Sequence, residues 1–199
     1  MEFQTTGQPG RFTFTGTAGQ GWSMQATAGS TFTSNIALSV YRPNGNLFTS
    51  TTLSGNSDVK VSFGLLPETG TYAVVVEPNG VDSGTVSMRL VAEATGTLTV
   101  DGGALSVVLG TAQNGRYTFA SSSGALLNLV ISSFATSPSG GSVTIYLYRP
   151  NGSHLWGTTV SSAPVTRQVT QLPDSGTYTL RVLPAGTRGA TSSLQLAPR

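Results

Sequence analysis

The fold of this chain is decided by one stretch of sequence, Ile36-Ala37-Leu38-Ser39-Val40-Tyr41-Arg42-Pro43-Asn44-Gly45. Its apolar residues Ile36, Leu38 and Val40 alternate with small or polar residues, which is the pattern of a β-strand with one buried face. The Pro-Asn-Gly sequence that follows is a turn signal, because proline presets φ and glycine accepts a positive φ. The stretch therefore predicts the first strand and the turn of a β-hairpin.

The same stretch returns as Val143-Thr144-Ile145-Tyr146-Leu147-Tyr148-Arg149-Pro150-Asn151-Gly152. Two other motifs also occur twice, Gln8-Pro9-Gly10-Arg11-Phe12-Thr13-Phe14 as Gln113-Asn114-Gly115-Arg116-Tyr117-Thr118-Phe119, and Leu66-Pro67-Glu68-Thr69-Gly70-Thr71-Tyr72 as Leu172-Pro173-Asp174-Ser175-Gly176-Thr177-Tyr178. The offsets between the copies are 105, 107 and 106 residues. A period of this length is a whole small domain, longer than a solenoid unit. We predict two tandem modules, residues 1–96 and 97–199.

The composition excludes several classes of function. Charged residues make up 9% of the chain, against roughly 25% in an ordinary domain. The net charge is +2 and the arginines are scattered singly, so the basic cluster of a nucleic-acid-binding surface is absent. The chain has no cysteine, and no apolar run in it approaches the length of a membrane-spanning helix.

Further period-two runs predict an all-β fold. We expect strands at residues 11–15, 22–26, 59–63, 72–76 and 85–91, with counterparts in the second copy. Turn signals separate these runs every 8 to 15 residues, as a β-sandwich requires. The predicted fold is two tandem, jelly-roll-like antiparallel β-sandwiches. Val75 and Arg181 occupy equivalent positions opposite the buried face, which predicts an exposed site.

The hairpin of the second copy has two candidate registers. A three-residue loop with a G1 bulge places Arg149 opposite Ser153 and Tyr148 opposite His154. On the same register Leu147 faces Leu155 and Tyr146 faces Trp156, and the first copy pairs Val40 with Phe48 inside. A two-residue Asn-Gly loop would instead put Trp156 beside Leu147 in the core. We favour the three-residue loop.

With these motifs in hand, the chain resembles the bacterial pre-peptidase C-terminal domain, a jelly-roll β-sandwich. The elements that carry the resemblance are the Gly-Arg-(Phe/Tyr)-Thr-Phe strand, the Tyr-Arg-Pro-Asn-Gly hairpin and the Leu-Pro-x-(Thr/Ser)-Gly-Thr-Tyr segment. The resemblance implies a non-catalytic accessory module of secreted or surface proteins, some of which bind polysaccharide or fibrous protein and some of which use calcium. No acidic cluster carries a calcium site over, since Asp58, Asp82 and Asp101 are far apart in sequence. We therefore expect no metal and no cofactor.

The second copy has a lead-in that the first copy lacks. Residues 97–100 and 105–109 predict one or two strands before the opening motif, whereas only residues 2–7 precede that motif in the first copy. Three explanations remain open. The first copy was cut from a longer array, which we favour, or residues 97–100 complete the first sandwich, or the missing first strand is supplied by another molecule, because an uncovered edge accepts strand addition.

The sequence predicts no catalytic residues. His154 is the single histidine, no Gly-x-Ser-x-Gly motif is present, and the carboxylates Glu68 and Asp174 lie in different copies. Leu66-Pro67-Glu68-Thr69-Gly70 matches a sortase sorting signal, but the equivalent Leu-Pro-Asp-Ser-Gly of the second copy favours a structural turn. We expect Tyr72 and Tyr178 to pack at the corner of each sandwich, with their hydroxyls bonded to nearby backbone.

The candidate ligand-binding residues are Tyr146, Tyr148, His154 and Trp156, with Arg149 as a polar neighbour. On the favoured register the four rings share the outward face of one hairpin, while the matching residues of the first copy are Ser39, Tyr41, Leu47 and Thr49. Aromatic rings on a sheet face can stack on sugars. The competing interpretation is ordinary cross-strand pairing or burial against the other module. Trp22 aligns with Leu127, which favours a core position.

These features together predict a non-catalytic, extracellular or cell-surface module of a larger bacterial protein. It would act in spacing and adhesion, with weak carbohydrate binding at the hairpin face and a polysaccharide or surface protein as partner. The alternative is a subunit of a surface fibre, assembled by exchange of an edge strand between repeats.

Overall fold

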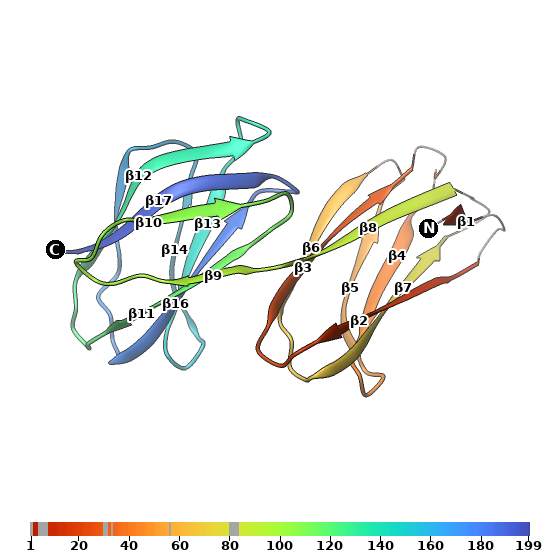
Figure 1. Cartoon of the computed structure of the whole chain (residues 1–199), viewed down its shortest axis with the longest axis horizontal. Helices are drawn as coiled ribbons and strands as arrows, with labels where there is room; N and C mark the ends of the chain where they lie inside the picture. The colour runs from red at the N-terminus through yellow and green to blue at the C-terminus, as the bar shows by residue number, and fades with distance from the viewer. Residues whose placement is uncertain (1, 4–7, 30–31, 33, 56, 80–83) are drawn as a thin grey trace. The chain divides into compact units, whose positions relative to one another are not determined.

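The chain forms two compact units in the computed structural model, which describes residues 2–3, 8–29, 32, 34–55, 57–79 and 84–199. Unit 1 is Met1–Ala92 and unit 2 is Glu93–Arg199. Figure 1 draws the strands of unit 1 in red to yellow-green and those of unit 2 in green to blue. The division falls a few residues before the boundary between residues 96 and 97 that the repeat pattern suggested. The described residues form strands and turns, with no helix.

Unit 1 is a sandwich of two four-stranded sheets. One sheet has the strand order β1-β8-β3-β6 and the other has the order β2-β7-β4-β5. The strands are β1 (Glu2–Phe3), β2 (Gly10–Gly16), β3 (Gly21–Ala28), β4 (Ile36–Tyr41), β5 (Leu47–Leu53), β6 (Asp58–Leu65), β7 (Gly70–Pro78) and β8 (Gly84–Ala92). The strand pairings that the structure describes in this unit are antiparallel.

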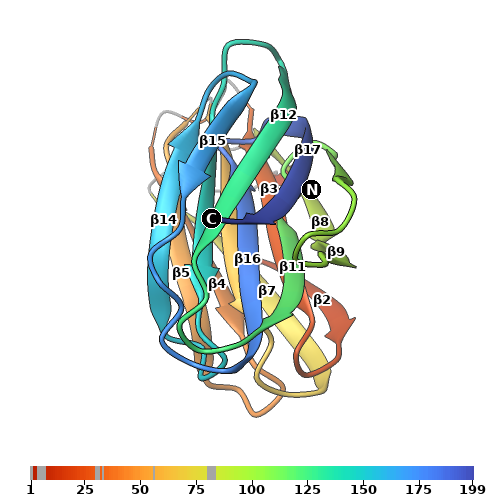
Figure 2. The ribbon, with the colours of Figure 1, turned by 90° about the vertical axis from the view of Figure 1, so that its left-hand side faces the viewer.

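Unit 2 repeats this arrangement and adds one strand. Its sheets have the orders β10-β17-β12-β15 and β14-β13-β16-β11-β9, and Figure 2 shows β11 beside β16 in the second of these. The strands are β9 (Ala94–Thr97), β10 (Leu105–Leu109), β11 (Gly115–Ser121), β12 (Leu127–Ser137), β13 (Val143–Tyr148), β14 (His154–Val160), β15 (Val165–Gln168), β16 (Gly176–Pro184) and β17 (Gly189–Pro198). Strand β9 is the added element, and it pairs with β11 in parallel.

The predicted buried faces are confirmed. Strands β4 and β13 have the bounds expected from the alternating pattern, and Ile36, Leu38 and Val40 are each at most 1% exposed. Their counterparts in unit 2 and the inward residues of β7 and β16 are at most 3% exposed: Val143, Ile145, Leu147, Tyr72, Val74, Val76, Tyr178, Leu180 and Val182. Each unit has its own apolar core, filled from both of its sheets. Trp22 packs against the core of unit 1, as its alignment with Leu127 predicted.

A buried tyrosine closes the same corner in each unit. Tyr178 is 0% exposed, and its hydroxyl donates to the carbonyl oxygen of Asp174 at 2.7 Å and accepts from the Asp174 N–H at 3.0 Å. Tyr72 makes the same two bonds to Glu68, at 2.8 and 3.2 Å. The expected backbone bonds of both hydroxyls are confirmed, and they give the Leu-Pro-Glu-Thr-Gly segment a structural role as the turn before β7.

The lead-in of the second copy belongs to unit 2. Leu105–Leu109 forms β10 as predicted, but the strand before it is Ala94–Thr97, and Val100 makes an isolated parallel bridge to Leu196. The explanation that residues 97–100 complete the first sandwich is therefore wrong. In unit 1, β1 pairs with the beginning of β8 as β10 pairs with the beginning of β17. Residues 4–7 lie outside the described residues.

Replacing Tyr178 by phenylalanine removes the corner bonds and keeps the ring. We expect Tyr178→Phe to lower the free energy of unfolding of unit 2 by about 1 kcal/mol, because the partly buried N–H and carbonyl of Asp174 lose their partner. Urea denaturation in a Trp22→Phe background, where Trp156 is the remaining indole, measures this directly. Tyr146→Phe removes an exposed hydroxyl and serves as the control, with an expected change within about 0.5 kcal/mol. An equal loss of unfolding free energy in the two variants would show that the hydrogen bonds between the Tyr178 hydroxyl and Asp174 do not stabilise unit 2.

Lys60 makes the stability of unit 1 depend on pH. Burial lowers the pKa of this ammonium group from 10.5 to about 8. Between these two values the unfolded chain binds more protons than the folded chain, so the free energy of unfolding rises as the pH rises from about 8 towards 10.5. We expect wild type to gain stability relative to Lys60→Met over this interval, measured by thermal denaturation followed by Trp22 fluorescence. A constant difference between the two proteins would show that Lys60 keeps its ordinary pKa.

Candidate ligand-binding face

The turn between β13 and β14 has the predicted three-residue form. The Arg149 N–H donates to the carbonyl oxygen of Ser153 at 2.8 Å, and the Gly152 N–H donates to that of Arg149 at 2.9 Å. Gly152 has a φ of 82°, which places it in the left-handed region that glycine tolerates. The side-chain oxygen of Asn151 accepts the Ser153 N–H at 2.9 Å. Arg149 therefore faces Ser153, as the favoured loop requires.

A β-bulge changes the register beyond this turn. Tyr148 pairs with His154 as predicted, but Leu147 then pairs with Trp156 and Tyr146 pairs with Gly157. Leu155 is the extra residue, so the expected pairs Leu147–Leu155 and Tyr146–Trp156 are wrong. Unit 1 has the same bulge, because Tyr41 pairs with Leu47 and Val40 pairs with Thr49. The expected Val40–Phe48 pair is therefore wrong as well.

The bulge removes Trp156 from the predicted group of rings. Leu155 and Trp156 are both partly buried and both pack against the core of unit 2. A bulge directs two successive side chains to nearly the same side of the strand, which explains why the outward phase expected for Trp156 is lost. No ring contact between Trp156 and the other three rings is present among the described residues.

The other three predicted rings do lie together. The ring centroids of Tyr146 and His154 are 5.4 Å apart, those of Tyr148 and His154 are 5.7 Å apart, and those of the two tyrosines are 6.5 Å apart. The planes meet at 72°, 80° and 62°, which is the edge-to-face geometry that aromatic rings prefer. We call Tyr146, Tyr148 and His154 the ring cluster.

The ring cluster is held in place by its neighbours and remains open to solvent. A Cβ atom on Gly157 would lie 2.8 Å from Cδ1 of Tyr146, so this ring lies directly over the glycine. Tyr146 is nevertheless 36% exposed, and His154 is exposed. The cluster therefore presents apolar ring surface to solvent from the β13–β14 hairpin.

Arg149, the predicted polar neighbour, directly follows Tyr148 in the chain. Its side chain is partly buried, and its Nε atom is inaccessible and makes no hydrogen bond in the described structure. Arg42 occupies the equivalent place in unit 1, where its guanidinium carbon lies 5.5 Å from the ring centroid of Phe48. Leu155 takes the place of Phe48 in unit 2, so Arg149 has no such ring beneath it.

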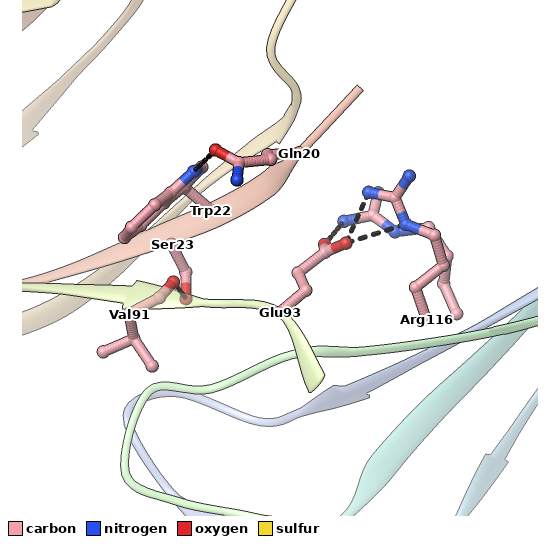
Figure 3. Close-up of polar contacts among 7 residues, drawn as sticks. Gln20, Trp22, Ser23, Val91, Glu93 and Arg116 are labelled. Carbon is pink, nitrogen blue, oxygen red and sulfur yellow. Dashed lines mark hydrogen bonds and ion pairs between the residues drawn. The ribbon is translucent and has the colours of Figure 1, made fainter. Parts of the chain in front are cut away.

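Sequence reasoning missed a buried charge cluster at the start of unit 2. The Glu93 side chain is 1% exposed and accepts from Arg116 Nε at 2.9 Å and from Arg181 Nη2 at 2.6 Å. Figure 3 shows the Glu93 carboxylate directed at the Arg116 guanidinium. The prediction that position 181 is exposed is wrong, because Arg181 is 20% exposed and paired with Glu93. The only sequence signal was the replacement of Val75 by an arginine.

The described residues contain no group of three or more His, Cys, Asp or Glu side chains that could hold a metal ion. Asp82, one of the aspartates considered in the sequence, lies outside them. In the part of the chain that the structure describes, no helix has the length and apolar character needed to cross a membrane.

Comparisons with known proteins found similarities to solved structures only. No protein-family model matches the chain, and the search of curated protein sequences found no match. A solved pre-peptidase C-terminal domain of a Bacillus anthracis collagenase matches 52% of this chain and 95% of its own length, with 15% identity and a TM-score of 0.39. A periplasmic inhibitor of g-type lysozyme from Aeromonas hydrophila matches 53% of this chain and 99% of its own, with 14% identity and a TM-score of 0.34. The exported protein XepA of PBSX covers 98% of this chain and 85% of its own, at 10% identity and a TM-score of 0.34. We draw no functional assignment from similarities of this degree.

The Glu93 cluster should contribute strongly to the stability of unit 2. We expect Glu93→Ala to lower the free energy of unfolding by about 3 kcal/mol, because it leaves two neighbouring, partly buried arginines without a counter-charge. Urea denaturation measures the loss. The matched control is Glu77→Ala, which removes an exposed glutamate and should change the stability by less than about 0.5 kcal/mol. A loss no larger than that of the control would show that the ion pairs of Glu93 do not stabilise unit 2.

Proposed function

We propose that the chain is a non-catalytic, extracellular or cell-surface β-sandwich module of a larger bacterial protein, acting in spacing and adhesion. The ring cluster of unit 2 would bind carbohydrate weakly. The observation that carries this proposal is the open ring surface of Tyr146, Tyr148 and His154 on one hairpin. Unit 1 has Ser39, Tyr41 and Leu47 at the equivalent positions, so the same fold holds together without the cluster.

The geometry of the cluster suits a small sugar surface. Three rings that meet at steep angles form a corner, and a sugar ring can place its C–H face on one ring while its hydroxyls reach the polar edges of the others. The tyrosine hydroxyls and the imidazole nitrogens supply these polar groups. Trp156 is not part of the proposed site, because it packs against the core.

The contacts of His154 support a non-catalytic role. Within the described residues its ring makes edge-to-face approaches to the two tyrosines, and its imidazole neither donates a hydrogen bond to a carboxylate nor accepts one from a serine. A histidine that acts as a general base needs such an orienting partner and a nearby nucleophile. Binding through the ring surface is the role that this environment favours.

Affinity gel electrophoresis with a panel of soluble polysaccharides tests the proposal. We expect one or more of these gels to retard the wild-type chain, and we expect Tyr148→Ala to weaken the binding by about tenfold, equivalent to about 1.4 kcal/mol. The matched control is Tyr41→Ala at the equivalent position of unit 1, which should leave the retardation unchanged. If no polysaccharide retards the wild type, or if the two variants behave alike, the ring cluster is not a carbohydrate site.

A further inference from the structure

The two units differ at one edge of equivalent sheets. In unit 2, β9 covers β11 as a parallel strand, with the Ala94 N–H donating to the carbonyl oxygen of Asn114 at 2.9 Å and the Leu98 N–H donating to that of Thr118 at 2.8 Å. In unit 1, the equivalent of β11 is β2, and the order β2-β7-β4-β5 makes β2 the edge of its sheet among the strands that the structure describes. Figure 1 labels β9 and β11 in unit 2 and β2 in unit 1. An edge strand with one neighbour offers its outward N–H and C=O groups to a further strand.

A cavity lies beside this edge in unit 1. It has a volume of about 250 Å³ and is lined by the mainly apolar side chains of β2, β3, β7 and β8: Phe12, Thr13, Met24, Val74, Val86, Met88 and Leu90. An engineered apolar cavity of about 150 Å³ accepts a benzene molecule. The cavity in unit 1 therefore has room for a branched aliphatic side chain.

Unit 2 shows what fills the equivalent space. Tyr117, Leu194 and Leu196 are the counterparts of Phe12, Met88 and Leu90, and they are 4%, 0% and 1% exposed, whereas the residues of unit 1 are only partly buried. Leu98, which directly follows β9, is 3% exposed and belongs to the same core as these residues. In unit 2, β9 and the leucine that follows it thus complete the sandwich. At the equivalent place in the described part of unit 1, β2 is an edge strand beside a cavity.

The positive charge of Arg11 and the ring of Phe12 on β2 suit a segment similar to Glu93–Leu98. In unit 2 the residue before β9 is Glu93, which binds Arg116, and the equivalent of Arg116 in unit 1 is the exposed Arg11. A Cβ atom on Gly96 would lie 3.1 Å from the Tyr117 ring, so the residue that crosses the ring must be small. Phe12 presents a similar ring at this position of β2.

We propose that β2 and the adjoining cavity form an acceptor site for an extended, parallel segment with the pattern Glu-small-Thr-Gly-Thr-Leu. The glutamate binds Arg11, the glycine crosses Phe12, and the leucine fills the cavity. The donor is another chain that carries this pattern before a repeat of the same type, because the Glu93–Leu98 segment of this chain is already engaged in unit 2. The acceptor site shares no residue with the ring cluster, so each proposal can fail without the other.

The first test uses the full 199-residue chain and a fluorescent peptide with the sequence of residues 93–100. We expect saturable 1:1 binding by fluorescence anisotropy, together with slower hydrogen exchange of the backbone amides of β2. A peptide with Leu98→Asp should bind at least tenfold more weakly, because a carboxylate in the cavity loses its hydration. Absence of binding, or protection of β11 in place of β2, would overturn the proposal.

A charge exchange tests the orientation of the segment. We expect Arg11→Glu to weaken the binding of the peptide severalfold, and we expect a peptide with Glu93→Lys to bind this variant better than the original peptide does. Arg89→Glu makes the same change of charge at an exposed site on β8 and should have little effect. Equal effects of the two variants would refute the contact with Arg11.

Light scattering of the chain without the peptide tests whether the donor segment comes from a second copy of this chain or from a different chain. We expect a mass that stays at 20.4 kDa over a concentration series, since the segment of each chain remains in its own unit 2. Growth in mass that the peptide suppresses would mean that copies of this chain exchange β9 among themselves, which overturns the assignment of the donor to a different chain.

Discussion

The corner tyrosine of each unit is the contact on which the rest of the structure depends. Tyr72 and Tyr178 are fully buried between the sheets, and their hydroxyls bind back to the turn that precedes their own strand. The glycine that ends this turn, Gly176 in unit 2, lies against Pro150 of the hairpin turn, where an added Cβ atom would approach to 3.0 Å. The phenol therefore joins the core to the Leu-Pro segment, and the glycine that ends this segment packs on the Pro-Asn-Gly turn, which gives a structural reason for the recurrence of these two motifs together.

The bulge after the Pro-Asn-Gly turn decides what each hairpin presents to solvent. It turns Leu155 and Trp156 towards the core and leaves Gly157 beneath the ring of Tyr146. In unit 1 the extra residue is Phe48, which contacts Phe63 and Tyr72 and lies beneath Arg42. The two hairpins thus share the same β-bulge and differ in the side chains that they expose. Unit 2 can therefore carry a ring cluster on the same backbone that lacks one in unit 1.

The other difference between the units concerns closure of the sandwich. Glu93, β9 and Leu98 act together at the start of unit 2, since the carboxylate is bound by Arg116 and Arg181, the strand pairs with β11, and the leucine enters the core. Unit 1 retains Arg11 and an apolar cavity at the corresponding place. In unit 2 the segment that leads into the sandwich is therefore also part of its core. The ring cluster and this edge are the two surfaces that set the units apart.

The sequence by itself determined the all-β class, the two copies, the bounds of β4, β10 and β13, and the inward residues of the main strands. These features follow from local alternation and turn chemistry, which a single strand or turn already expresses. Tertiary structure alone decided the bulge at Leu155, the parallel pairing of β9 and the burial of Glu93. At the bulge, Leu155 and Trp156 pack against the core of unit 2. The pairing of β9 and the burial of Glu93 depend on residues farther apart in the chain: Arg181, for instance, reaches the Glu93 carboxylate from another strand. Periodicity therefore placed Tyr146, Tyr148 and His154 on one face correctly and failed for Trp156, because a single inserted residue inverts the phase of every position that follows it.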